Sequence, residues 1–171
     1  MVIKAIGFDF DGTLIMSEGA KAEMMYAAFS KFFSLSKIEH KKLVVEYGKL
    51  VGKGNTRDKK VAILFKKIIG RTGNTSEKNK IAQAFGAEYK KSLNHCPLFA
   101  CHQLVSQLQG KVEHLFLLSL EDQKEVQSVA KHCSLAVYFD EILGGPSDKV
   151  THLKRLLKRW KLKPNEMLYI G

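Results

Sequence analysis

The amino-acid sequence predicts an α/β protein, a Rossmann-like, doubly wound parallel sheet with a helical cap inserted after its first strand. Three observations support this prediction. A short apolar run, residues 2–8, ends at two carboxylates. Residues 15–95 then show helical periodicity. Beyond Pro97, short apolar runs alternate with helical patterns, which is typical of parallel strands joined by helices.

The first two parts of the chain predict one strand and four helices. Residues 2–8 are apolar on both faces, as in a central parallel strand. The segment 15–95 contains four groups of apolar residues at helical spacing, separated by polar breaks that include 52–55 and 70–75. These groups are Ala22, Met25, Ala28, Phe29, Phe32 and Phe33; Leu43, Val44, Tyr47, Leu50 and Val51; Val61, Leu64, Phe65, Ile68 and Ile69; and Ile81, Phe85 and Tyr89.

The remainder of the chain predicts three helices and three strands. In order, we expect a helix at 99–109, a strand at 114–118, a helix at 121–132, a short strand within 135–143, a helix after Ser147 or Asp148, and a strand at 167–170. The sheet domain therefore comprises residues 1–14 and 96–171, and the helical domain residues 15–95.

Composition indicates an ordinary soluble protein, with 45% hydrophobic and 26% charged residues among 171. No apolar stretch approaches the roughly 20 residues needed to span a bilayer. Asp9 and Asp11 interrupt the first apolar run, which argues against a signal peptide. Cys96, Cys101 and Cys133 are odd in number and lack metal-ligand spacing, so we expect reduced thiols in a cytoplasmic protein. The neighbouring His95 and His102 offer a weaker metal alternative.

Positive charge is concentrated in the helical segment. The net charge is +11, and residues 15–95 contain 17 Lys and Arg against 7 Asp and Glu. This excess favours an anionic substrate or partner. The aromatic residues of the segment have core spacing, and no nucleic-acid-binding motif is present, so a nucleic-acid partner is not expected.

The most informative segment is residues 8–14, Phe-Asp-Phe-Asp-Gly-Thr-Leu, directly after the apolar run 2–7. Residues two apart in an extended chain point the same way, and open α/β sheets build active sites beyond the carboxyl ends of their strands. Asp9 and Asp11 can therefore share one site. Paired carboxylates can hold a divalent cation, or act as nucleophile and general acid/base. A simple turn at Asp11-Gly12 is the alternative, but the whole pattern is much rarer than that dipeptide.

This segment resembles the first motif of the haloacid dehalogenase superfamily in its phosphatase form. The resemblance implies that Asp9 is the nucleophile and Asp11 the general acid/base. It also implies that the Asp9 carboxylate and the Asp11 carbonyl hold Mg²⁺. Thr13 resembles the residue that fixes this phosphate-binding loop. The helical insertion fits capped, phosphoglycolate-phosphatase-like members, whereas Ser17, where the chain enters the insertion, receives no role.

Three further residues are candidates for phosphate or substrate binding. Ser119 follows a strand and resembles the second motif of the superfamily, with an ordinary N-cap as the alternative. Lys149 opens a helix, where a cation is unfavourable unless an anion stands opposite, and it resembles the third-motif lysine. A solvated surface lysine is the alternative. Arg57 follows a loop of the cap and is a candidate substrate contact, or else part of a solvated helix face.

These observations predict a Mg²⁺-dependent phosphatase that acts on a small phosphomonoester through an aspartyl-phosphate. A phosphomutase, a phosphonate hydrolase and an inactive module that binds polyanions are the alternatives, and the oligomeric state is not predicted. The sequence ends at Gly171, where relatives normally continue with acidic residues that complete the Mg²⁺ site. We therefore expect either a truncated phosphatase or a natural short form with weak or no activity.

Overall fold

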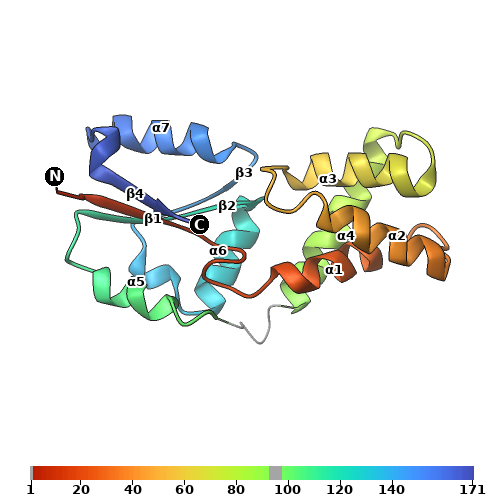
Figure 1. Ribbon diagram of the computed structural model, residues 1–171, viewed down its shortest axis with the longest axis horizontal. Coiled ribbons are helices and arrows are strands. Elements are labelled where there is room, and N and C mark those ends of the chain that lie inside the picture. Colours follow the sequence, from red (N-terminus) through yellow and green to blue (C-terminus); the bar gives the residue numbers. More distant parts are fainter. Residues whose placement is uncertain (1, 93–97) are drawn as a thin grey trace. The chain divides into compact units, whose positions relative to one another are not determined.

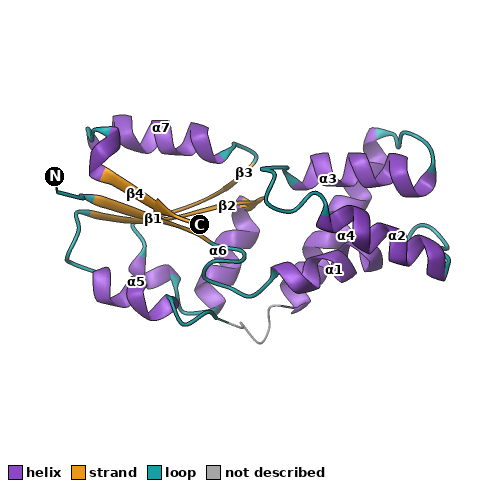
Figure 2. Ribbon diagram, viewed as in Figure 1, coloured by secondary structure: helices purple, strands orange, loops and turns teal. Residues whose placement is uncertain are grey.

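The computed structural model describes residues 2–92 and 98–171. The chain forms two compact units, Met1–Ser17 with His95–Gly171, and Glu18–Asn94. The first contains the strands, and the described part of the second consists of helices and loops (Figure 2).

The first unit is built around a four-stranded parallel sheet. Its strands are β1 (Ala5–Asp9), β2 (His114–Asp122), β3 (Glu141–Gly145) and β4 (Met167–Ile170), in the order β3-β2-β1-β4. Ala5 pairs with His114 on one side and with Met167 on the other. Because all strands run in one direction, their carboxyl ends meet at the same edge. This is the edge at which an active site is expected.

Helices cover both faces of this sheet, which confirms the prediction of a doubly wound α/β fold. The helix α7 (Lys149–Trp160) lies on one face, and α5 (His102–Leu108) and α6 (Gln123–His132) lie on the other (Figure 1). Short 3₁₀ turns at Ala136–Tyr138 and Pro164–Glu166 precede β3 and β4. Beneath α7, a buried cluster consists of Ala5, Phe116, Leu118, Leu143 and Leu156.

The second unit contains α1 (Glu18–Ser30), α2 (Lys37–Gly48), α3 (Arg57–Leu64), a π-helical turn η1 (Phe65–Ile69) and α4 (Thr75–Ser92). Ser36 begins α2 with a capping box, because its hydroxyl accepts from Glu39 N while the Glu39 carboxylate accepts from Ser36 N. The apolar residues at helical spacing form the interior of the unit. They include Met25, Phe29, Leu43, Tyr47, Val61, Leu64, Phe65, Ile81, Phe85 and Tyr89.

Strand β2 extends further than its sequence pattern predicts. The predicted strand ends at 118, whereas β2 continues to Asp122 through a register shift against β3 between Leu118 and Asp122. Glu121 is consequently buried within the strand and does not open the following helix. Asp122 is the N-cap of α6, and its carboxylate accepts from the backbone N–H groups of Lys124 and Glu125. An irregularity of this kind arises from pairing between strands, which periodicity alone cannot reveal.

The cysteines depart from expectation at one position. Cys101 is an exposed free thiol, but Cys133 is disulfide-bonded, so the prediction of reduced thiols is wrong for Cys133. His95 and Cys96, two of the residues behind the weaker metal alternative, lie outside the described residues. Among the helices of the described segments, none has the length and apolar character to cross a membrane.

Candidate active site

The two aspartates lie at the carboxyl end of β1, where a tight loop begins. Asp9 is the last residue of β1, and its Oδ1 accepts from the Phe10 N–H at 2.8 Å. The Phe10 carbonyl then accepts from the N–H groups of Leu14 and Ile15 at 2.9 and 3.0 Å. Gly12 has φ of 77°, a left-handed conformation that side chains other than glycine rarely adopt. The loop therefore fixes Asp9 and Asp11 at the sheet edge.

Lys149 forms an ion pair with Asp9. Its Nζ lies 2.6 Å from Asp9 Oδ2, and the two side chains are 26% and 22% exposed. Lys149 is the first residue of α7, whose N-cap is Asp148. Since a helix N-terminus carries partial positive charge, a lysine in this position is stabilised by the opposing carboxylate. A phosphoryl group beside Asp9 would meet the same ammonium.

The N-terminal end of α7 is held by its cap. Asp148 accepts from both the backbone N–H and the hydroxyl of Thr151, each at 2.9 Å. These two hydrogen bonds hold the pKa of the Asp148 carboxyl below its usual value, and the bond from the backbone N–H has the larger effect. The charged N-cap residue Asp148 therefore fixes the start of α7, the helix that carries Lys149.

The Asp11 carboxylate is held by two serine hydroxyls. Ser17 Oγ donates to Asp11 Oδ1 at 2.5 Å, and Ser119 Oγ donates to Asp11 Oδ2 at 3.2 Å. The Ser119 oxygen also accepts from the Glu121 N–H at 3.1 Å. The structure thus joins two of the predicted site residues, Asp11 and Ser119, through a direct hydrogen bond. No role for Ser17 can be predicted from the sequence, because only the folded loop brings its hydroxyl to Asp11.

Thr13 and Arg57, the other two predicted site residues, lie in different units of the chain and make different contacts. The Thr13 carbonyl accepts from the thiol of Cys101 at 2.9 Å, which ties the loop to the segment before α5. Arg57 is the first residue of α3 in the helical unit. Its guanidinium lies 4.9 Å from the centre of the Phe85 ring and donates to the Ala82 carbonyl at 3.5 Å. Phosphate binding by Thr13 and substrate contact by Arg57 both stay predictions.

The end of β3, before the loop that leads to α7, is fixed by side chains from α6 and α7. Gln123 Nε2 donates to the Ile142 carbonyl at 2.7 Å, and its Oε1 accepts from the Gly144 N–H at 2.6 Å. On the other side, His152 Nε2 lies 3.0 Å from the Gly144 carbonyl, which requires a proton on that nitrogen. The amide of Gln123 replaces backbone pairing at the register shift of β2. Together these contacts determine where the chain leaves the sheet before Lys149.

The oxygen donors of the site fit a cation that retains water. Mg²⁺ is commonly held by one or two carboxylates and keeps several waters. Asp9 and Asp11 supply such donors at one strand end. Residues 2–92 and 98–171 contain no cluster of three or more His, Cys, Asp or Glu side chains suited to a metal. The donor set present therefore fits Mg²⁺ only with water completing its coordination.

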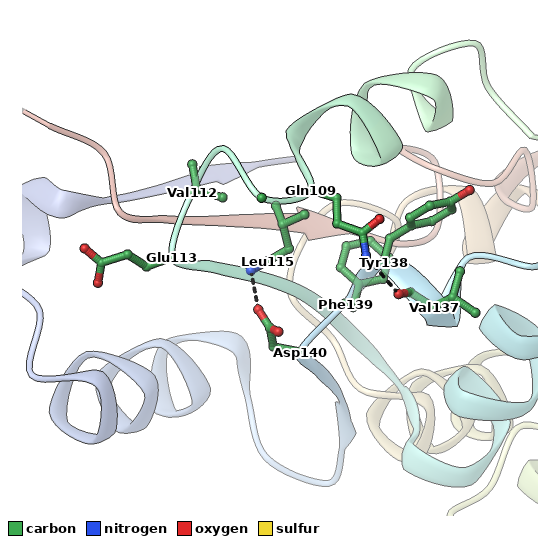
Figure 3. A pocket seen from close by; sticks show the side chains of 9 residues that line it. Gln109, Val112, Glu113, Leu115, Val137, Tyr138, Phe139 and Asp140 are labelled. Carbon is green, nitrogen blue, oxygen red and sulfur yellow. Dashed lines mark hydrogen bonds between the residues drawn. The ribbon is translucent and has the colours of Figure 1, made fainter.

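A separate cavity lies at the opposite end of the sheet. Its volume is about 240 Å³, and it is lined by residues at the starts of β2 and β3, including Leu115 and Asp140 (Figure 3). The Leu115 N–H donates to Asp140 Oδ2 at 2.8 Å, and Gln109 donates to the Val137 carbonyl at 3.5 Å. Because the cavity is at the amino ends of these strands, it is distinct from the site around Asp9.

Comparison with known proteins gives one family and many similar folds. The haloacid dehalogenase-like hydrolase family matches residues 3–171. A predicted phosphoglycolate phosphatase from Haemophilus somnus 129PT is 23% identical, with a TM-score of 0.75 over 99% of this chain and 76% of that chain. A haloacid dehalogenase-like hydrolase from Streptococcus pneumoniae is 22% identical, with a TM-score of 0.70 over 99% and 75%.

A predicted phosphatase from Clostridium acetobutylicum is 18% identical, with a TM-score of 0.72 over 100% of this chain and 76% of that chain. At these identities the three structures establish likeness of fold. No curated protein matches the sequence.

Proposed function

The chain belongs to the haloacid dehalogenase-like hydrolase family, and from this premise we propose that it is a Mg²⁺-dependent phosphatase of a small phosphomonoester. The observation that carries the proposal is the 2.6 Å ion pair between Asp9 and Lys149 at the carboxyl edge of the sheet. A carboxylate can act as the nucleophile in phosphoryl transfer, and a fixed cation beside it can stabilise the charge that develops on the phosphoryl oxygens. The similarity in fold to a predicted phosphoglycolate phosphatase supports a small phosphorylated substrate.

The proposed first step forms an aspartyl-phosphate. An oxygen of the Asp9 carboxylate attacks phosphorus, and the bond between phosphorus and the ester oxygen breaks. Asp11 donates a proton to the leaving alkoxide, which departs as an alcohol. The hydrogen bonds from Ser17 and Ser119 support this role, because they fix the orientation of the Asp11 carboxyl group.

The proposed second step restores the enzyme. A water molecule attacks phosphorus, its proton passes to Asp11, and the bond between phosphorus and Asp9 breaks to release phosphate. Lys149, Ser119 and Thr13 hold the phosphoryl oxygens in both steps, with Lys149 opposing the negative charge that builds up. Mg²⁺, held by the Asp9 carboxylate and the Asp11 carbonyl, would supply further charge neutralisation at the phosphoryl group.

The helical unit is the proposed cap, which selects the leaving group. We assign residues 15–95 to the cap and residues 1–14 with 96–171 to the catalytic core. Arg57 is the proposed contact to the substrate, and the excess of lysine in the cap favours an anionic one. A cytoplasmic location also remains a proposal, although the disulfide at Cys133 does not support it, because cytosolic thiols are kept reduced.

The test is release of phosphate from a panel of small phosphomonoesters, with Mg²⁺ and with a chelator. We expect turnover that requires Mg²⁺ and that Asp9→Asn abolishes. Lys149→Met should lower kcat by about 10²- to 10³-fold, the usual effect of removing one group that stabilises transition-state charge. Lys154→Met is the matched control, since it removes an exposed lysine from the same helix.

Other outcomes identify the alternatives. Conversion of a sugar phosphate to its isomer without release of phosphate would indicate a mutase. Lack of turnover on every ester, together with salt-sensitive binding of an oligonucleotide, would indicate a polyanion-binding module. Normal turnover by Asp9→Asn would contradict the proposed mechanism.

A further inference from the structure

Tyr169 lies beside the proposed nucleophile on the sheet face covered by α7. It is in β4 and pairs with Gly7, two residues before Asp9. A methyl group on Gly171 would lie 2.7 Å from Asp9 Cβ and 3.4 Å from Tyr169 Cε1, so the two side chains flank the same point. From the sequence, Tyr169 is predicted only to lie in the strand at 167–170.

The tyrosine ring also faces Lys149. Lys149 Nζ lies 5.4 Å from the centre of the ring while it contacts Asp9 Oδ2 at 2.6 Å. The ammonium group therefore has a carboxylate and an aromatic face as simultaneous neighbours. Cations are attracted to the faces of aromatic rings within about 6 Å, most strongly where water is excluded. Both partners of the ion pair are only about a quarter exposed.

The tyrosine hydroxyl makes no visible contribution to these contacts. It is buried and has no hydrogen-bond partner within the described part of the chain. The side chain packs against the buried cluster of Ala5, Phe116, Leu118, Leu143 and Leu156. Burial raises the pKa of the phenol, and the nearby charge of Asp9 raises it further, so the group is neutral at physiological pH. The aromatic ring is thus the part of the residue that acts on its neighbours.

We propose that Tyr169 is a positioning residue of the active site, whose ring holds the Lys149 ammonium against Asp9, where phosphoryl oxygens bind. The inference rests on the proposed phosphatase function and adds a residue to it. Lysine has a long, flexible side chain that loses much rotamer freedom when it is fixed in one place. If the ring already holds the ammonium in place, less side-chain entropy is lost when phosphate binds.

The experiment compares three variants at a temperature where all are folded. Tyr169→Leu removes the ring and should lower kcat/KM by about 2- to 30-fold, the range that corresponds to a cation–π interaction of about 0.5 to 2 kcal/mol. Tyr169→Phe keeps the ring and should restore most of the lost turnover. Met167→Ala is the matched control, because Met167 is two residues away on the same strand and packs on the same cluster. It should reduce stability and leave turnover unchanged.

A double-mutant cycle tests whether Tyr169 acts through Lys149. In the Lys149→Met background, Tyr169→Leu should have no further effect on kcat/KM or on competitive inhibition by inorganic phosphate. Equal turnover of Tyr169→Leu and wild type would overturn the inference, as would an undiminished effect of Tyr169→Leu without Lys149. In either case the proposed function would still hold, provided that the wild type turns over substrate and Asp9→Asn does not. Failure of the proposed function appears separately, as absence of wild-type turnover or as full activity of Asp9→Asn, and removes the premise of this inference.

Discussion

Gly144→Ala introduces a methyl group near the end of β3, at a point where the backbone of residues 121–123 lies very close. The new Cβ would lie 2.7 Å from the Glu121 carbonyl oxygen, and 2.8 and 2.9 Å from Cα and N of Gln123. All three are backbone atoms, so rotation of a side chain cannot relieve the contacts. Overpacking of this kind costs about 1 to 3 kcal/mol of unfolding free energy. For a chain of 171 residues this corresponds to a fall in Tm of about 2 to 12 °C.

The same substitution should reduce catalysis. Relief of the contacts must move Gly144 away from β2, which weakens its hydrogen bonds with Gln123 and His152. Lys149 follows five residues later and would move with the loop. Since a displacement of about 1 Å in a catalytic group can cost about 10²-fold, we expect a measurable fall in kcat up to that factor. Thermal unfolding followed by circular dichroism, and turnover well below the lower Tm, measure the two effects.

Gly145→Ala is the matched control for this prediction. A Cβ on Gly145 would have its nearest contacts at 3.3 and 3.4 Å, which a small adjustment can relieve. Its Tm and turnover should therefore change far less than those of the Gly144 variant. If Gly144→Ala unfolds and turns over like wild type, the close approach of Gly144 to β2 does not position Lys149, and the reasoning is refuted.

Two more predictions concern the loop after β1 and the helical unit. Ser17→Ala removes one of the two hydroxyl donors to Asp11, so steady-state kinetics should show a lower kcat with little change in KM; unchanged kcat would contradict a role for this hydrogen bond. Hydrogen bonds from Lys49 and Lys67 lower the pKa of Glu46 to about 2, so its stabilising effect is present above its ordinary pKa of 4.5 and is lost as pH falls towards 2. Denaturant unfolding should show Glu46→Gln less stable than wild type at pH 7, with the difference shrinking below pH 4.5; a constant difference would contradict the assignment.

Much of the fold could be predicted from local pattern. The strand before Asp9 and the helix after Asp148 are both visible in the sequence, because apolar periodicity and cap residues are local signals. The extension of β2 past residue 118 cannot be predicted from local pattern, since it depends on pairing with β3 and on the side chain of Gln123. The number and spacing of the cysteines predict reduced thiols, but spacing carries no information on how Cys133 is paired.

The candidate site could be predicted in part. The sequence predicts a strand that ends near Asp9 and a helix that begins near Lys149, and the structure brings the two side chains into contact. The contacts of Ser17 and Tyr169 cannot be predicted from the sequence, because they depend on the folded structure. Ser17 contacts Asp11 only because the loop between them folds back. Tyr169 is one of four residues in a short strand, and the register of that strand decides which face of the sheet the tyrosine occupies.

The central claim is that Asp9 carries the phosphoryl group between the two steps. Rapid quenching during turnover of a phosphomonoester, followed by peptide mass spectrometry, measures this directly. The account predicts a phosphorylated peptide with the modification on Asp9, formed in the presence of Mg²⁺ and absent from Asp9→Asn. Phosphorylation of another residue, or turnover by Asp9→Asn at the wild-type rate, would contradict it.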